Sequence, residues 1–299
     1  MRIAVTGGSG FVGQHLLKRL LKDNHEITVL SHRKNNPGTF EGNVHVVSGS
    51  VDSPEEMVPA FQGSTAVYHL VGIIAETKTN DFEKTVAQGT RNVVVACQEA
   101  QVEKIIFLSA LGTSEQATTA YHRTKFEAEQ AVIGSGLEWV ILRASIIYGK
   151  GDGFLTLMSK IIKWSPLTPI FGDGVYKMQP VYIDDLTEAM TKALDLPQAS
   201  RQIIDIGGPE QLEYEEIINH IKQALKLRRL NFNIPFAVIR PVATVLESLL
   251  TPAPLTRDQL TMLRMGNTGD ITKMKELFRI QPVRFEDGLK MVIGDKING

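Results

Sequence analysis

The sequence is poor in cysteine and has no long uncharged apolar run. Its single cysteine is Cys97. One thiol forms neither an internal disulfide nor a cysteine-rich metal site, so we expect no metal site and a reducing, cytoplasmic location. No run of 18 uncharged apolar residues occurs, which argues against a membrane-spanning helix. Met1 and Arg2 lead directly into a predicted strand, so we expect no signal peptide.

The chain also lacks an excess of either charge. It has 32 lysine and arginine residues against 33 acidic residues, a formal net charge of −1. Proteins that bind nucleic acid usually carry a basic excess, so we expect no nucleic-acid partner. The 299 residues are 43% hydrophobic, as in an ordinary globular protein. This length suits one large domain, or one domain with an appended lobe.

A glycine-rich stretch follows the first apolar run, 3–5, and opens into an amphipathic helix. Gly7, Gly10 and Gly13 recur at every third position. Gly7 permits a tight turn, Gly10 lets the backbone approach a pyrophosphate, and Gly13 lets the helix pack closely. Phosphates bind well at the positive end of a helix dipole. The motif therefore predicts a dinucleotide site, although a glycine-rich turn without a ligand would look similar. The expected loop contacts are Gly7, Ser9, Gly10, Phe11, Val12 and Gly13.

The end of the second predicted strand, 27–30, bears on the choice of cofactor. In dinucleotide-binding folds this end faces the adenosine ribose, where a carboxylate favours NAD and a cation favours NADP. No carboxylate stands here, and Arg33 offers a planar, permanent charge. We therefore expect NADP(H) to be preferred over NAD(H). The alternative is that Arg33 and Lys34 belong to a solvated loop.

Strands and helices alternate through the first half of the chain. The predicted strands are 3–5, 27–30, 43–47, 66–72, 104–109 and 137–143. This alternation predicts an α/β fold with a doubly wound parallel sheet. We expect Val51 to lie under the adenine, and Val71 and Gly72 to approach the cofactor where the fourth strand ends. His69, inside an apolar run, is more typical of a satisfied core residue than of a ligand.

The second half has shorter and less regular elements. Helices are predicted at 154–164, 186–194 and 214–225, and strands at 179–185 and 202–208. We expect a dinucleotide-binding core over 1–150, to which later strands return, and a smaller C-terminal α/β lobe over 151–299. The apolar segment 234–250 includes Arg240, Pro241 and Glu247. These interruptions favour a helix that packs on the protein, lies on a bilayer surface or docks a partner.

Tyr121 and Lys125 form the pair most suggestive of chemistry. Residues four apart share one face of a helix. A lysine ammonium near a tyrosine is expected to lower the phenol pKa, which is ordinarily near 10. The tyrosine could then exchange a proton with a substrate oxygen while a nicotinamide moves a hydride. The same lysine could bind the nicotinamide ribose. Taken alone, the spacing is common on exposed helices.

These residues together resemble the short-chain dehydrogenase/reductase superfamily in its extended or atypical branches. The segment 142–149 is similar to a family motif that borders the nicotinamide, with Ala144 where proline is usual. The segments 177–185 and 254–259 resemble the NAD(P)H-binding accessory subunit of respiratory complex I and its bacterial relatives. The resemblance implies a Rossmann-type core and a smaller C-terminal substrate lobe.

Two departures from the family pattern affect the site. Ser50 stands where the family often has an aspartate that contacts adenine. The exit of the fifth strand is poorer in serine and threonine than in the extended enzymes. By the resemblance, Ser109 is the best candidate for the hydroxyl that polarises the substrate, with Thr113 and Ser114 as rivals. The expected catalytic set is therefore Tyr121, Lys125 and Ser109.

Two functions remain open from the sequence. The first is an NADP(H)-dependent oxidoreductase or epimerase-like enzyme acting on a small carbonyl or hydroxyl compound, a quinone among them. The second is a non-catalytic NADPH-binding subunit or assembly factor of a respiratory complex, peripheral to the inner face of a membrane. The intact Tyr121–Lys125 pair favours the first. The apolar segment 234–250 favours the second. The resemblance to the complex I subunit does so too, because that subunit is generally regarded as structural. Nucleotide sugars are less favoured, because Arg228 and Arg229 are the one clear cationic cluster of the C-terminal lobe.

Overall fold

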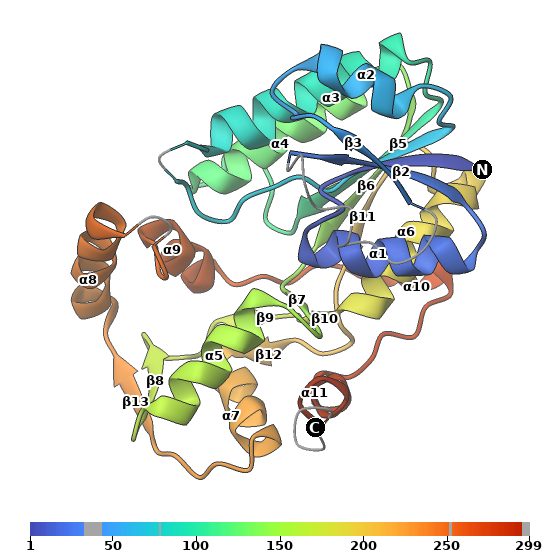
Figure 1. Cartoon of the computed structure of the whole chain (residues 1–299). Helices are drawn as coiled ribbons and strands as arrows, with labels where there is room; N and C mark the ends of the chain where they lie inside the picture. Colours follow the sequence, from blue (N-terminus) through green and yellow to red (C-terminus); the bar gives the residue numbers. More distant parts are fainter. Residues whose placement is uncertain (33–43, 78, 251–252, 295–299) are drawn as a thin grey trace. The chain divides into compact units, whose positions relative to one another are not determined.

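The computed structural model describes residues 1–32, 44–77, 79–250 and 253–294 (Figure 1). The chain forms two compact units. Unit 1 contains Met1–Ala144, Thr187–Asp205 and Ile271–Ile280. Unit 2 contains Ser145–Leu186, Ile206–Asp270 and Gln281–Gly299.

Unit 1 is built on a seven-stranded sheet in the order β11-β6-β5-β4-β1-β2-β3. The strands are β1 Arg2–Thr6, β2 Glu26–Ser31, β3 Val44–Ser48, β4 Ala66–His69, β5 Lys104–Ala110, β6 Glu138–Ala144 and β11 Gln202–Ile206. Neighbouring strands from β3 to β6 pair in parallel. Helices cover both faces, so the central strands are apolar throughout; Ile3, Ala4 and Val5 have no exposed surface. The predicted doubly wound parallel sheet is confirmed.

Helices cover the two faces of this sheet in separate layers. Figure 1 shows α2, α3 and α4 on one face and α1, α6 and α10 on the other. Their bounds are α1 Phe11–Lys22, α2 Pro54–Phe61, α3 Gly89–Glu99, α4 Ala120–Ile133, α6 Ile183–Asp195 and α10 Thr272–Phe278. A π-helical segment, η2 Glu83–Gln88, leads directly into α3, and a 3₁₀ turn, η3 Pro197–Ala199, follows α6. Phe107 of β5, Val93 of α3 and Ala128 of α4 belong to one fully buried core.

The strand order reverses at the centre of the sheet. β1 lies between β2 and β4, so the chain leaves β1 towards one side and returns on the other. In open parallel sheets, ligands bind beyond the carboxyl ends of the strands at this reversal point. Gly7 follows β1 and Leu70 follows β4, so both lie at the reversal point of this sheet.

Unit 2 has its own core and short strands. The core includes Tyr148, Tyr214 and Phe285, each at most 2% exposed. Its helices are α5 Gly153–Trp164, α7 Tyr214–Ala224 and α11 Phe285–Gly294. The paired strands are β7 Ile147–Tyr148 with β10 Val181–Tyr182, β9 Lys177–Met178 with β12 Leu212–Glu213, and β8 Thr168–Phe171 with β13 Asn231–Ile234. The strand predicted at 179–185 is too long, because α6 already begins at Ile183.

Two further helices of unit 2 make a small satellite cluster. They are α8 Phe236–Leu249 and α9 Arg257–Met265. Ile239 and Ala243 of α8 pack with Leu260 of α9. Most of α8 outside this contact is exposed. Across the part of the chain that the structure describes, we find no helix long and apolar enough to cross a membrane.

Candidate functional site

The loop between β1 and α1 needs glycine at two positions for steric reasons. Gly7 has a φ of 76°, a left-handed conformation that side chains rarely adopt. A Cβ on Gly7 would lie 3.0 Å from the carbonyl carbon of Leu70 and from the amide of Val71. A Cβ on Gly13 would lie 2.4 Å from the Gly7 carbonyl oxygen. The loop therefore folds tightly against the end of β4 as the glycine spacing predicts.

The N-terminus of α1 is suited to bind an anion. Gly10 is the cap residue, and its amide donates to the Gly7 carbonyl at 3.0 Å. No side chain caps the helix, and its first turn has no acidic residue. The first amides and the positive end of the helix dipole are thus available to a phosphate. Ser9 and Gly10 are exposed, while Phe11 and Val12 are half-buried.

The exit of β4 brings the glycine loop and α4 to the same place. Val71, beside Gly7, also packs on the core of unit 1. A Cβ on Gly72 would lie 3.4 Å from the Lys125 Nζ atom. Gly7, Gly72 and Lys125 are therefore linked through adjacent contacts at the reversal point of the sheet. Their roles in binding a cofactor stay a prediction.

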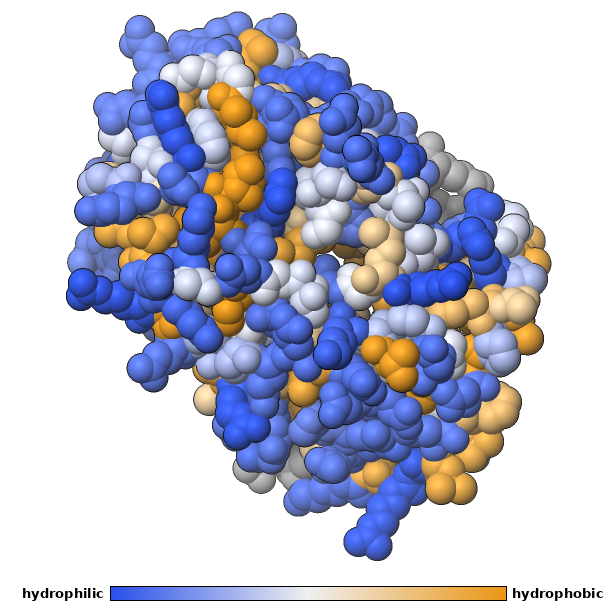
Figure 2. All heavy atoms as spheres, turned by 180° about the vertical axis from the view of Figure 1, so that it is seen from behind, coloured by the Kyte–Doolittle hydropathy of each residue, from blue (hydrophilic) through white to orange (hydrophobic). Residues whose placement is uncertain are grey.

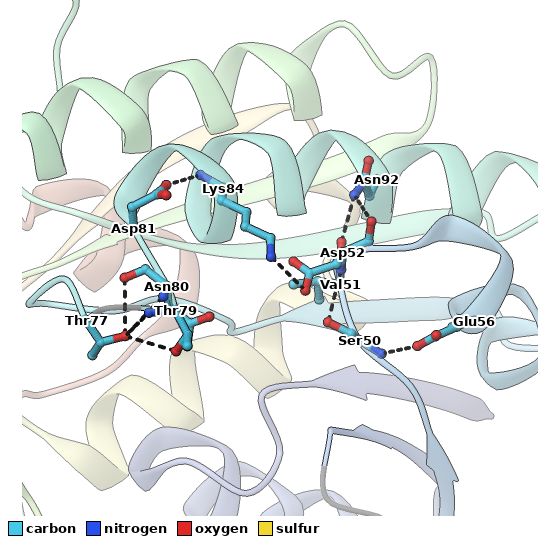
Figure 3. Close-up of polar contacts among 10 residues, drawn as sticks. All are labelled: Ser50, Val51, Asp52, Glu56, Thr77, Thr79, Asn80, Asp81, Lys84 and Asn92. Atoms are coloured by element: carbon cyan, nitrogen blue, oxygen red, sulfur yellow. Dashed lines mark hydrogen bonds and ion pairs between the residues drawn. The ribbon is translucent and has the colours of Figure 1, made fainter.

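The exit of β3 is held by polar contacts that the sequence did not reveal (Figure 3). Asn92 of α3 donates to the carbonyls of Val51 and Asp52, at 2.9 and 3.0 Å. The Ser50 amide donates to Glu56 Oε2 at 2.9 Å. These bonds fix the backbone of Val51, whose side chain is 8% exposed. Ser50 and Val51 thus occupy a rigid turn after β3, where the adenine is predicted to bind.

The remaining residues of Figure 3 form the approach to η2. Lys84 makes an ion pair with Asp52 at 3.5 Å and connects η2 to this turn. The Asp81 carboxylate accepts from the Lys84 amide at 2.6 Å, at the start of this segment. Arg33, on which the preference for NADP(H) depends, lies outside the described residues.

Tyr121 and Lys125 lie on α4, which begins with Thr119 as its cap. Lys125 is 4% exposed, and its Nζ donates to the Leu108 carbonyl of β5 at 2.8 Å. The same Nζ lies 4.7 Å from the centre of the Phe107 ring. Tyr121 is half-buried, and its ring meets Phe82 edge-on at 5.8 Å between centroids. The lysine is therefore held at the sheet, while the tyrosine lies one turn earlier on the same helix face.

Lys125 does not lower the pKa of Tyr121 as the sequence predicted. Burial raises the pKa of Tyr121 to about 12. Burial also lowers the pKa of Lys125 to about 8, against an opposing effect of the Glu129 carboxylate. The prediction of a lowered tyrosine pKa was wrong, because burial desolvates the phenolate and so disfavours it. At neutral pH Tyr121 is a phenol and Lys125 is mostly charged.

Ser109 does not have the environment that its predicted role requires. Ser109 is 4% exposed, and its hydroxyl donates to Glu129 Oε1 at 2.5 Å. A serine has one proton to donate, so this hydroxyl cannot also donate to a substrate oxygen. Thr113 likewise donates to the Ala110 carbonyl at 2.7 Å, whereas Ser114 is exposed. The structure corrects the assignment of Ser109 from a substrate donor to a partner of Glu129.

Glu129 is the buried charge that the sequence reasoning missed. It has no exposed surface, and Arg143 of β6 binds it with Nε at 2.9 Å and Nη2 at 2.6 Å. The Glu129 carboxylate is the largest cause of a raised Arg143 pKa. A signal was present, since Tyr121, Lys125 and Glu129 recur at intervals of four residues.

His69 is a satisfied core residue, as predicted. It has no exposed surface, and burial lowers its pKa to about 3. The Thr90 hydroxyl donates to the Val86 carbonyl at 2.6 Å, so His69 Nε2 must donate to Thr90, at 2.9 Å. Nδ1 then accepts from Thr6 at 2.7 Å. Within the described ranges, no group of three histidine, cysteine or acidic side chains is arranged to hold a metal.

This chain is similar to known proteins over most of its length. Residues 3–207 match the model of the NAD dependent epimerase/dehydratase family. An Arabidopsis thaliana 3β-hydroxysteroid dehydrogenase/decarboxylase, isoform 2, is 25% identical over 97% of this chain. This chain spans 61% of the length of that relative. The mitochondrial NADH dehydrogenase [ubiquinone] 1 alpha subcomplex subunit 9 of Arabidopsis thaliana is 24% identical over 88% of this chain and 68% of its own.

A solved structure shares the fold over the whole chain. UDP-glucose 4-epimerase from Thermotoga maritima superposes with a TM-score of 0.78 and 21% identity, covering 100% of this chain and 99% of its own. The family model covers more than half of the sequence, including the glycine loop and the Tyr121–Lys125 helix. The chain therefore belongs to the NAD dependent epimerase/dehydratase family of the extended short-chain dehydrogenase/reductase superfamily, and it is an NAD(P)-dependent enzyme of that type.

Proposed function

We propose that this protein is an NADP(H)-dependent oxidoreductase or epimerase-like enzyme that acts on a small carbonyl or hydroxyl compound. The observation that carries the proposal is the placement of Lys125. Its Nζ lies beside Gly72 at the reversal point, and Tyr121 shares its helix face. This is where a nicotinamide would lie if its diphosphate occupied the N-terminus of α1.

The residues present fit the cofactor at both ends. The uncapped α1 terminus would hold the diphosphate, and Lys125 would donate to the nicotinamide ribose. When bound, the cofactor would supply or accept a hydride. Val51 would border the adenine at the end of β3.

The protonation state of Tyr121 favours the reductive direction. With its pKa raised to about 12 by burial, the side chain remains a phenol at neutral pH. Reduction of a carbonyl requires a proton at the oxygen, and a phenol supplies one. The phenolate that remains after transfer would then have to regain a proton before the next turnover. The substrate class is therefore a ketone, an aldehyde or a quinone, or the corresponding alcohol in the reverse reaction.

The test is a hydride-transfer screen of the purified protein with NADPH and NADH across quinones, sugars, ketones and aldehydes. Given a substrate, we expect Tyr121→Phe to lower the rate by about 10²–10⁴-fold and to leave NADPH affinity nearly unchanged. Tyr176→Phe removes the same oxygen from a tyrosine of unit 2 and serves as the control. A Tyr121→Phe enzyme that works at the unmodified rate would rule out this proton transfer.

A second role as a subunit of a larger assembly, or at a membrane surface, rests on α8. Val238, Val242, Val245 and Leu249 form one stripe of this helix and are 46–76% exposed. Figure 2 shows apolar atoms along the edge of the molecule where α8 lies, at the right after the turn of the view. An exposed apolar stripe of this kind suits a partner protein or a bilayer interface.

Flotation with anionic liposomes tests whether the α8 stripe binds a bilayer or a partner protein. Binding to the bilayer should be lost in a variant with Val242→Ser and Leu249→Ser, whereas Val95→Ser, at an exposed position of unit 1, should float like the unmodified protein. If the unmodified protein remains at the bottom of the gradient, the membrane version of this role is wrong.

A further inference from the structure

A buried charged cluster next to the Tyr121–Lys125 pair joins three elements of unit 1. Glu129 of α4 accepts from Ser109 of β5 and from Arg143 of β6. Ser109 and Arg143 are direct neighbours in the sheet register. The carboxylate therefore binds the carboxyl ends of two adjacent strands to one helix.

The cluster is connected to Lys125 through consecutive residues of β5. Leu108 accepts from Lys125 Nζ at 2.8 Å, and the next residue, Ser109, donates to Glu129 at 2.5 Å. Lys125 and Glu129 are four residues apart, so they occupy the same face of α4. The two bonds fix the rotation of α4 about its axis and its position along β5. The position of Lys125 Nζ relative to Gly72 depends on both.

Glu129 also determines the charge around Lys125. Of the charged and titratable groups that interact with the lysine, His69 of β4 is neutral at pH 7, because burial lowers its pKa to about 3. The Glu129 carboxylate is the opposing negative charge, and it favours the ammonium form that burial disfavours. Without it, a buried lysine would lose its proton more readily.

We propose that Glu129 is a positioning residue for the cofactor, which holds Lys125 at the reversal point and keeps it in the charged form that binds the ribose. This inference rests on the proposed function, because it takes Lys125 to be a cofactor ligand. It assigns to Ser109 and Arg143 the role of holding the Glu129 carboxylate.

The experiment measures NADPH affinity against pH by fluorescence, without any substrate. In the unmodified protein, affinity should fall as Lys125 loses its proton near pH 8. Glu129→Gln keeps the shape but removes the charge, so the midpoint should move down by about 1 pH unit or more. Glu127→Gln removes a carboxylate from a half-exposed position of the same helix, paired with Arg91, and should leave the midpoint unchanged.

A merely structural role gives a different result. It would weaken binding by the same factor at every pH, with no movement of the midpoint, and would overturn the inference. Glu129→Asp retains the charge and should restore the midpoint even where overall affinity is reduced. If Glu129→Gln does not fold, because Arg143 is left without its partner, the double variant Glu129→Gln/Arg143→Met removes both charges. Its midpoint should still fall, since the charge that shifts the Lys125 pKa is that of Glu129.

The same measurements distinguish a failure of the proposed function from a failure of the inference about Glu129. If Lys125 is not a cofactor ligand, Lys125→Met binds NADPH as tightly as the unmodified protein, and the affinity of the latter shows no midpoint near pH 8. If the midpoint is present in the unmodified protein and unchanged in Glu129→Gln, the inference about Glu129 is wrong while the proposed function stands.

Discussion

The two ends of the candidate cofactor site are built in different ways. At the phosphate end, the β1–α1 loop offers main-chain amides, and its essential residues are glycines without side chains. At the other end, Tyr121 and Lys125 act through side chains whose protonation depends on burial and on Glu129. The first end is a matter of backbone geometry, and the second is a matter of electrostatics.

This difference determines how each end responds to change. A side chain added at Gly7 or Gly13 meets main-chain atoms, which cannot move aside without disturbing β1 or β4. A changed side chain on α4 leaves the backbone in place but alters charge and proton transfer. Substitutions at the phosphate end should therefore either abolish cofactor binding or leave it intact. The effects of substitutions at the other end should vary with pH.

The largest expected effect is at Gly10. A Cβ on Gly10 would meet only the Gly7 carbonyl oxygen, at 3.3 Å, and the Gly10 φ of −75° suits any residue. We expect Gly10→Val to fold and to lose NAD(P)H binding, because the side chain fills the path of the diphosphate. Calorimetry and circular dichroism measure the two properties. Gly153→Val adds the same side chain at an open helix start in unit 2 and should bind normally. Full affinity in a folded Gly10→Val protein would show that the phosphate site is elsewhere.

The next effect concerns stability at Lys125. Its folded pKa of about 8 lies below the ordinary value of 10.5, so the unfolded chain binds more protons between these values and stability rises with pH there. Lys125→Met removes this buried charge. We expect the variant to gain up to about 3 kcal/mol of unfolding free energy at pH 7 relative to the unmodified protein, while binding NADPH more weakly.

Urea unfolding from pH 7 to 10.5 tests the sign of this effect. The advantage of Lys125→Met should shrink steadily as the unmodified protein loses its buried charge. A constant difference across that range would show that Lys125 carries no desolvation cost, and the electrostatic side of the comparison would fail. Lys22→Met, at an exposed position of α1, should show no such trend.

The smallest effect is expected in cofactor choice. If Arg33 binds the 2′-phosphate, NADPH should bind more tightly than NADH, and Arg33→Ala should reduce that preference by about 10-fold, as for loss of a charged hydrogen bond. Calorimetry with both cofactors measures the ratio, and Lys22→Ala controls for the loss of one positive charge. Tighter binding of NADH by the unmodified protein would contradict the preference.

The geometry of the β1–α1 loop could be predicted from the sequence because its determinants are local. The loop, its turn and the helix that follows lie within a few consecutive residues, and each glycine has a steric reason that spacing alone reveals. The Tyr121–Lys125 face was predictable for the same reason, since residues four apart always share a helix face. The role of Ser109 was not predictable, because its partner Glu129 is on another element, 20 residues away.

Unit 2 shows the same limit at the level of secondary structure. Its helices at 153–164 and 214–224 were predicted closely, because amphipathic periodicity extends over whole turns. Its two-residue strands carry no periodic pattern. β9, for example, is defined by pairing with β12 across more than 30 residues and by the bridge from Met178 to Asn267.

The sequence by itself determined the doubly wound sheet, the glycine loop at its first turn and the shared helix face of Tyr121 and Lys125. Those features follow from periodicity and from local steric limits. Only the tertiary structure decided the protonation of the two side chains and the partner of Ser109. The reason is that desolvation depends on every element packed around a group. Lys125 meets Leu108, and Glu129 meets Arg143, only when β5, β6 and α4 are assembled.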